Sequence, residues 1–301
     1  MSDLEQRDNP YNVTQASRIY FLPNLMTAGN LFCGFAAVIK CIQARLITDL
    51  GEYAGIHSQV TSNELYTHAV WLILAAVVFD SLDGRLARMG GRTSLFGAEF
   101  DSLADVVSFG MAPALMVFFL ILAPRGDYQW FREFGWFIAF IYLLCGAVRL
   151  ARFNVITNPL LHRAEKESNK DFVGLPIPAA AGTVATLVLL LLNMSANARE
   201  LREWTLALPL LLILVSFLMV STVRYPSFKQ VNWETRTKVR SFVAFLVVAG
   251  IAIKLREISF FFLFLAYIFY GLFAHYQRGV RHVQMRALRR KVVKMKLDSS
   301  E

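Results

Sequence analysis

The sequence is short of charge for its length. Only 18% of its 301 residues are charged, whereas 56% are hydrophobic and 25 are Phe. A soluble domain carries about 25% charged residues, so the composition excludes an ordinary soluble fold. Runs of roughly 20 apolar residues, each long enough to cross a bilayer as an α-helix, recur along the chain. We therefore expect an all-α integral membrane protein.

Cysteine is also scarce. Cys33, Cys41 and Cys145 form no CxxC pair, and two of them lie in apolar segments. This pattern indicates packing residues rather than disulfide or zinc partners. The N-terminus has no basic region leading into a cleavage site, so no signal peptide is expected. The sequence shows neither an internal repeat nor a low-complexity segment.

The net charge of +9 has two interpretations, nucleic-acid binding or anchoring of a membrane protein on its cytoplasmic side. Anchoring is favoured because the basic residues lie between and after the apolar runs, so no nucleic-acid partner is expected. The runs predict eight membrane spans, at residues 21–44, 67–89, 96–123, 135–157, 175–195, 205–223, 241–255 and 257–275. Eight spans place both termini on one side. The basic tail makes that side cytoplasmic, in the cytoplasmic membrane.

These spans divide the chain into four segments. Residues 1–22 form a cytoplasmic N-terminal segment with an interfacial helix, and residues 23–223 form a core of six helices. Residues 224–275 add a C-terminal hairpin of two helices. The basic tail, residues 276–301, either lies along anionic headgroups or is a solvated charged segment.

Two pairs of carboxylates interrupt the apolar pattern. Asp80 and Asp83 are three residues apart near the end of the second span, and Asp101 and Asp105 are four residues apart in the third. Both spacings put a pair on one helix face. A turn at Gly90–Gly91 would fold the two helices antiparallel. We therefore expect the four acids to converge at the cytoplasmic end of this pair.

Acids near hydrocarbon are costly and mark a functional site by default. Four carboxylates repel one another unless a cation lies between them. Mg²⁺ and Mn²⁺ prefer oxygen ligands and often bridge to substrate phosphates, and a pair of such ions can clamp a phosphoryl group. The alternative is an ion-pair cluster of Asp80 and Asp83 with Arg85 and Arg88 that caps a helix end. Four acids at these spacings, with glycines interposed, favour the metal site.

The pattern Asp80-x-x-Asp83-Gly84-x-x-Ala87-Arg88, eight residues, then Gly97-x-x-x-Asp101-x-x-x-Asp105 resembles the complete CDP-alcohol phosphotransferase signature. Four further blocks resemble the phosphatidylserine synthase subgroup of that family: LPNLMTAGNLFCGF, DSLADVVSFGMAPAL, CGAVRLARFN and FVGLPIPAAAG. Together these blocks cover about the first two thirds of the chain, and residues 23–223 correspond to the six-helix core of the family.

The resemblance implies roles for individual residues. Metal would be held by Asp80, Asp83, Asp101 and Asp105, with two divalent ions in each site, and Asp105 would also act as general base. The CDP-lipid would be bound by Gly84, Ala87, Arg88, Ser94 and Gly97, and by Thr27 and Asn30 in the first span. The implied reactants are CDP-diacylglycerol and L-serine, with CMP released among membrane lipids. The resemblance also implies a homodimer.

The acceptor site is assigned from the fourth span. Arg149 and Arg152 lie one turn apart near its cytoplasmic end and are candidates for binding the serine carboxylate or a phosphate. Their alternative role is headgroup anchoring. Asn154 is a candidate for orienting the amino acid. The FVGLPIP block is expected to form a wall of this pocket, or to serve only as helix punctuation.

Three other functions compete. The same transfer could use glycerol 3-phosphate or an inositol phosphate as acceptor, which would call for a further basic pocket. An ion- or proton-coupled transporter would place the acids near the membrane midplane and repeat its halves. A lipid-binding scaffold would tolerate the loss of Asp105. The clustering of the acids at one end and the absence of a repeat favour the enzyme.

Overall fold

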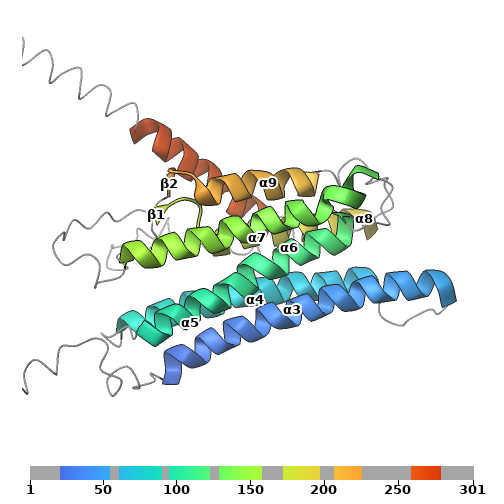
Figure 1. Cartoon of the computed structure of the whole chain (residues 1–301), viewed down its shortest axis with the longest axis horizontal. Helices are drawn as coiled ribbons and strands as arrows, with labels where there is room; N and C mark the ends of the chain where they lie inside the picture. Colours follow the sequence, from blue (N-terminus) through green and yellow to red (C-terminus); the bar gives the residue numbers. More distant parts are fainter. Residues whose placement is uncertain are drawn as a thin grey trace, which may run out of the picture.

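The computed structural model describes residues 21–54, 61–89, 95–122, 129–157, 172–196, 207–225 and 259–278. The helices and strands run in the order α3 (Phe21–Ala54), α4 (Ser62–Met89), α5 (Leu95–Asp105), η1 (Val106–Met111), α6 (Ala112–Val117), η2 (Phe118–Leu122), α7 (Gln129–Thr157), β1 (Phe172–Val173), α8 (Ile177–Ala196), α9 (Ala207–Val220) and β2 (Arg224–Tyr225). A last helix, Ser259–Arg278, follows and is red in Figure 1.

Within the described residues, six helices are long and apolar enough to cross a membrane, and α9 is a shorter apolar helix. The expected all-α membrane fold is therefore confirmed. The expected span at 241–255 lies outside the described residues, as do the expected interfacial helix and the tail beyond residue 278. The division of the chain into four segments stays a prediction.

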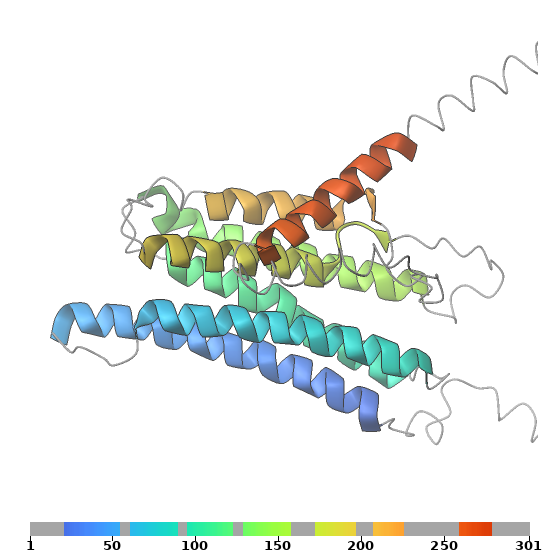
Figure 2. The same cartoon turned by 180° about the vertical axis from the view of Figure 1, so that it is seen from behind.

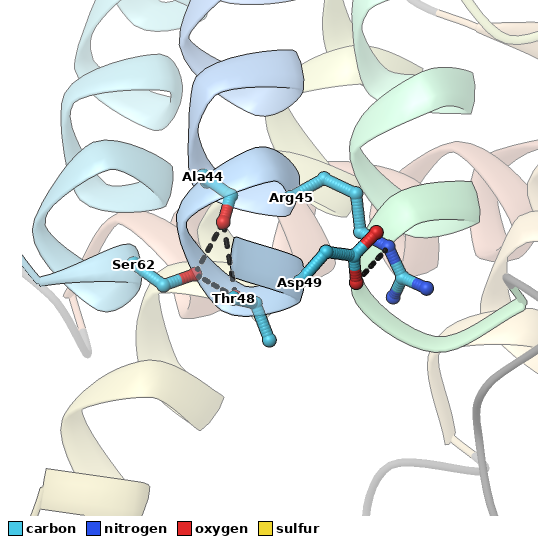
Figure 3. Close-up of polar contacts among 5 residues, drawn as sticks. All are labelled: Ala44, Arg45, Thr48, Asp49 and Ser62. Atoms are coloured by element: carbon cyan, nitrogen blue, oxygen red, sulfur yellow. Dashed lines mark hydrogen bonds and ion pairs between the residues drawn. The ribbon is translucent and has the colours of Figure 1, made fainter. Parts of the chain in front are cut away.

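The first two helices form a hairpin whose far end is longer than expected. α3 continues to Ala54, ten residues beyond the predicted end, and α4 begins five residues before its predicted start. Figure 3 shows how this end is held: Thr48 Oγ1 and Ser62 Oγ both donate to the Ala44 carbonyl, at 3.0 and 3.2 Å. Arg45 Nε pairs with Asp49 at 3.3 Å. Polar helix-forming residues extend the helices past their apolar stretches, so hydropathy alone ended α3 too early and started α4 too late.

The third span is one continuous helix with two π-helical segments, from Leu95 to Leu122. Pro113 lacks an N–H and cannot donate to the carbonyl of Phe109. The Tyr142 hydroxyl donates to that oxygen instead, at 3.0 Å. Wider π turns occur frequently at functional sites, and η1 directly follows Asp105.

α3 contacts both helices that carry the acids, α4 and α5. It packs along α4 and also contacts α5 and η1, while α7 packs against α9 and η1 (Figure 1). Both helices carry small residues that are fully buried, Ala37 and Ala44 in α3 and Ala69 and Ala76 in α4. Small side chains let membrane helices approach closely, so α3 and α4 form a tight pair.

A short strand pair joins the entrance of α8 to the exit of α9. β1 and β2 are antiparallel, with Phe172 opposite Tyr225. Gly174 has φ +82°, and a Cβ there would collide with the Met219 carbonyl, so this position requires glycine. The Gly174 N–H donates to the Val223 carbonyl at 2.8 Å. The FVGLPIP block therefore connects the start of α8 to the end of α9. The sequence did not predict this pairing, because strands of two residues are too short to show an alternating pattern.

The helix Ser259–Arg278 crosses α8, as Figure 2 shows. The ring of Phe264 occupies the space that a side chain at Gly182 of α8 would need. Phe260 meets Trp71 of α4 edge to face, with ring centroids 6.0 Å apart. Specific packing thus holds this helix against the core formed by the earlier spans.

Candidate active site

The structure brings the acids of α4 and α5 together. Asp80, Asp101 and Asp105 each offer a carboxylate oxygen, and these oxygens all lie within 4.8 Å of one another. The carboxyl group of Asp83 is close enough to that of Asp101 to interact with it directly. The convergence expected from the spacing is therefore present, and both helices also contact α3.

The chemistry of this cluster fits a divalent cation. Asp83 and Asp105 are each only 6% exposed, and Asp80 and Asp101 are partly buried. One carboxylate oxygen of Asp101 is buried and has no hydrogen-bond partner among the described residues. Unpaired, buried carboxylates at such distances repel strongly. A hard cation would satisfy oxygen donors of this kind, so these residues could hold a metal ion.

Two buried side chains of α3 hold two of the acids. Thr27 Oγ1 donates to the carboxylate of Asp83, and Asn30 Nδ2 donates to Oδ1 of Asp105 at 3.0 Å. The sequence assigned Thr27 and Asn30 only to the nucleotide pocket, and that role stays a prediction. Their spacing of three residues inside an apolar run is the signal that could have suggested a shared polar face.

Asn30 is itself fixed from η1. The Ser108 hydroxyl donates to the backbone carbonyl of Asn30 at 2.9 Å. A Cβ on Gly34, one turn along α3, would collide with both the backbone and the side chain of Ser108. Glycine at position 34 therefore lets η1 approach α3 closely enough for this bond. Sequence reasoning missed both Gly34 and Ser108.

Arg149 of α7 approaches the acids from the other side. It lies within electrostatic range of Asp105 and Asp80, and its Nε is buried without a hydrogen-bond partner among the residues that the structure describes. Arg152, one turn further along, is exposed. The structure therefore places one of the two candidate arginines beside the carboxylates, and the role of Arg152 stays a prediction.

Asn154 of α7 contacts α5 through Ser102 and Glu99. Its Nδ2 donates to Ser102 Oγ at 2.9 Å and to Glu99 at 3.4 Å. Ser102 directly follows Asp101 in the chain, so these bonds connect the end of α7 to the helix that carries two of the acids. The structure gives Asn154 a part in joining α5 and α7, and its expected contact with the amino acid stays a prediction.

Several residues expected to bind the CDP-lipid lie near the end of α4 and the start of α5 in the sequence. Gly84 directly follows Asp83, and Gly97 lies one turn before Asp101. Ala87 and Arg88 belong to the last turn of α4, in a part whose side chains are not described, and Ser94 lies outside the described residues. Their predicted roles remain predictions.

Sequence comparisons agree with this arrangement. The profile of the CDP-alcohol phosphatidyltransferase family matches residues 20–215. The chain is 36% identical to a CDP-diacylglycerol–serine O-phosphatidyltransferase of Helicobacter pylori over 218 residues, 72% of this chain and 77% of that protein. It is 33% identical to an archaetidylserine synthase of Methanothermobacter thermautotrophicus over 207 residues, 68% and 69% of the two chains. A CDP-diacylglycerol–serine O-phosphatidyltransferase of Saccharomyces cerevisiae is 36% identical over 164 residues, 54% and 51%.

Proposed function

The chain belongs to the CDP-alcohol phosphatidyltransferase family, and on that basis we propose that it is a phosphatidylserine synthase. It would transfer the phosphatidyl group of CDP-diacylglycerol to the hydroxyl of L-serine and release CMP. The observation that carries this proposal is the convergence of Asp80, Asp101 and Asp105 within 4.8 Å. Serine as acceptor is supported by the names of the bacterial and yeast relatives.

The four aspartates would hold divalent ions, Mg²⁺ or Mn²⁺, with two in each site as the family resemblance implies. When bound, such ions neutralise the diphosphate and stabilise the charge that develops on it. The fit rests on the donor set, which consists of carboxylate oxygens alone, and on the buried Asp101 oxygen that lacks a protein partner among the described residues. Thr27 would orient Asp83 for this task through their hydrogen bond.

Asp105 would act as the general base. The serine hydroxyl is a weak nucleophile near neutral pH, and a carboxylate within hydrogen-bond reach can take its proton during attack. Asn30 holds Oδ1 of Asp105, which leaves Oδ2 to receive the proton. The serine oxygen then forms a bond to the lipid-bearing phosphorus, and the bond from that phosphorus to the CMP oxygen breaks, with its electron pair leaving on CMP.

The attack would be direct, without a phosphatidyl-enzyme intermediate. Positioning and charge stabilisation can supply the rate, so no covalent protein chemistry is needed. A single displacement inverts the configuration at phosphorus. Retention of configuration, measured with a chirally labelled CDP-lipid, would contradict this mechanism.

The membrane arrangement follows from the same proposal. With eight spans and a cytoplasmic basic tail, the acids would face the cytoplasm, where a soluble amino acid and a lipid-borne nucleotide can meet. Acyl chains would enter between helices from the bilayer while CMP leaves to water. We also propose the homodimer that the family resemblance implies.

An acceptor panel tests the proposed reaction. Purified protein is incubated with CDP-diacylglycerol, with or without Mn²⁺, and with labelled L-serine, glycerol 3-phosphate or an inositol phosphate. Thin-layer chromatography should show labelled phosphatidylserine only with serine and metal. If the folded protein labels lipid with glycerol 3-phosphate and not with serine, the phosphatidyl transfer stands and the assignment of serine as acceptor is wrong.

A further inference from the structure

Two tyrosines beyond the region matched to the family meet beside Arg149. Tyr225 belongs to β2 and Tyr267 to the helix Ser259–Arg278, and their ring centroids lie 5.7 Å apart. Tyr225 is fully buried. Its hydroxyl has no hydrogen-bond partner among the described residues. Burying a phenol without a partner is costly, so this hydroxyl is a candidate ligand group.

The tyrosines connect to the catalytic cluster through Arg149. Tyr267 lies within electrostatic range of both Tyr225 and Arg149. Arg149 in turn lies within range of Asp105 and Asp80. Arg149 therefore interacts electrostatically with both the proposed base and Tyr267, whose ring lies against that of Tyr225. The Nε of Arg149, like that hydroxyl, is buried without a partner in the described structure.

The two tyrosines are held by specific packing. A Cβ on Gly271 would collide with the ring of Tyr225, so the absence of a side chain there lets the helix Ser259–Arg278 lie directly on that ring. Phe264 fits against Gly182 of α8 in the same way. The pairing of Tyr225 with Phe172 fixes β2 from the other side. Rigid support of this kind is what a binding subsite requires.

The unpartnered groups suit a carboxylate. A guanidinium donates charge-assisted hydrogen bonds to carboxylate oxygens, and a neutral phenol can donate one more. The phenols are neutral, so the arginine supplies the single positive charge of this group of residues. One positive charge neutralises a carboxylate of charge −1 but not a phosphate of charge near −2. An amino acid acceptor carries such a carboxylate close to its hydroxyl.

We propose that Tyr225 and Tyr267 form, with Arg149, the subsite for the carboxylate of the acceptor amino acid. This inference rests on the proposed function, because it assumes that Asp105 faces the acceptor hydroxyl. Through Tyr267, the helix Ser259–Arg278 would then contribute to the selection of the acceptor. It also extends the acceptor site beyond the fourth span and the FVGLPIP block, to which the sequence analysis assigned it.

Steady-state kinetics of single hydroxyl deletions test the subsite. Tyr225→Phe and Tyr267→Phe keep the rings and their packing and remove only the hydroxyls. We expect the KM for L-serine to rise about tenfold in Tyr225→Phe and at least about threefold in Tyr267→Phe, since a lost hydrogen bond to a charged group has an effect of this order. The KM for CDP-diacylglycerol should stay within about twofold.

The matched control is Tyr276→Phe, on the same helix, whose residue is 70% exposed. It should leave both KM values within about twofold. If wild-type protein makes no phosphatidylserine from serine, the proposed function fails. If the wild type is active and both hydroxyl deletions keep the serine KM within about twofold, only the tyrosine subsite is overturned. If Tyr225→Phe does not fold, the serine KM of Tyr267→Phe alone tests the subsite.

Acceptor fragments separate binding of the carboxylate from a merely structural effect. 3-Hydroxypropionate keeps the carboxylate and hydroxyl of serine, and ethanolamine keeps the ammonium and hydroxyl. Tyr225→Phe should weaken inhibition by 3-hydroxypropionate about tenfold and leave inhibition by ethanolamine unchanged. Equal weakening of both inhibitors would contradict a carboxylate subsite, because general damage to the pocket affects both alike.

Discussion

Asn30 of α3 donates a hydrogen bond of 3.0 Å to Asp105 of α5, although 75 positions separate the two residues. The carboxylate assigned as base is thus oriented from a helix that carries none of the four acids. Asn30 is fully buried, and Ser108 holds its backbone carbonyl. The first span therefore contributes to the proposed active site through its contacts with the acids.

Replacing Asn30 with Ala should lower kcat about 10- to 100-fold, the usual range for a residue that orients a catalytic ligand. Without the amide, the carboxylate of Asp105 loses the hydrogen bond from Asn30 and can rotate. The measurement is phosphatidylserine formation at saturating serine. Asn63→Ala, at the exposed far end of α4, is the control and should keep its rate. An unchanged kcat in Asn30→Ala would remove Asn30 from the mechanism.

Asp105→Asn should abolish turnover while leaving CDP-lipid binding largely intact. The amide keeps the shape of the side chain and can still meet Asn30, but it cannot accept the serine proton. General-base catalysis contributes about 10²- to 10⁴-fold, so a loss of at least about 100-fold is expected. Asp49→Asn, at the opposite end of the α3–α4 hairpin, serves as control. Normal turnover in Asp105→Asn would refute the assigned base.

Gly34→Ala should destabilise the protein by about 1–3 kcal/mol, as forced overpacking of a core does. The added methyl group would meet the backbone of Ser108, which cannot move aside as a flexible side chain could. The expected result is a lower Tm in detergent together with reduced activity, because Asn30 loses the support of η1. Ser108→Ala, which removes the hydrogen bond without a clash, should reduce activity with a smaller loss of Tm. A Gly34→Ala protein as stable as the wild type would contradict this close approach.

Removal of divalent metal should abolish activity, and Mg²⁺ or Mn²⁺ should restore it. Because a cation would relieve repulsion among the acids, it should also stabilise the fold, by about 2.7 kcal/mol at a metal concentration 100 times its Kd. Thermal unfolding after treatment with a chelator, with and without added Mn²⁺, measures this effect. Asp80→Asn and Asp101→Asn should show a smaller rise in Tm than Asp49→Asn. Equal rises in all three variants would place the metal elsewhere.

The clustering of the four aspartates could be predicted from the sequence because it depends on residues that are close together in the chain. Spacings of three and four residues fix which helix face carries Asp80 and Asp83 or Asp101 and Asp105, and apolar runs indicate which segments are long enough to cross a membrane. The convergence of the two pairs in space followed from a short connection between neighbouring helices. Each of these inferences uses residues close together in the chain.

What the sequence did not reveal depends on distant contacts. The bonds from Thr27 to Asp83 and from Asn30 to Asp105 cross 56 and 75 positions, and no periodicity encodes them. The pairing of Phe172 with Tyr225 involves strands of two residues, too short for an alternating pattern. The approach of Tyr267 to Arg149 depends on the packing of the helix Ser259–Arg278, which lies outside the region matched to the family. Phe264 and Gly271 position that helix against the earlier spans.

The most direct test of the account is the stoichiometry of CMP release in protein reconstituted with CDP-diacylglycerol. Adding L-serine in the presence of Mg²⁺ or Mn²⁺ should release one CMP for each phosphatidylserine formed, with little release before serine is added. Asp105→Asn should show neither product. CMP release that does not depend on serine, or phosphatidylserine formation by Asp105→Asn at the wild-type rate, would contradict direct attack by a serine hydroxyl deprotonated by Asp105.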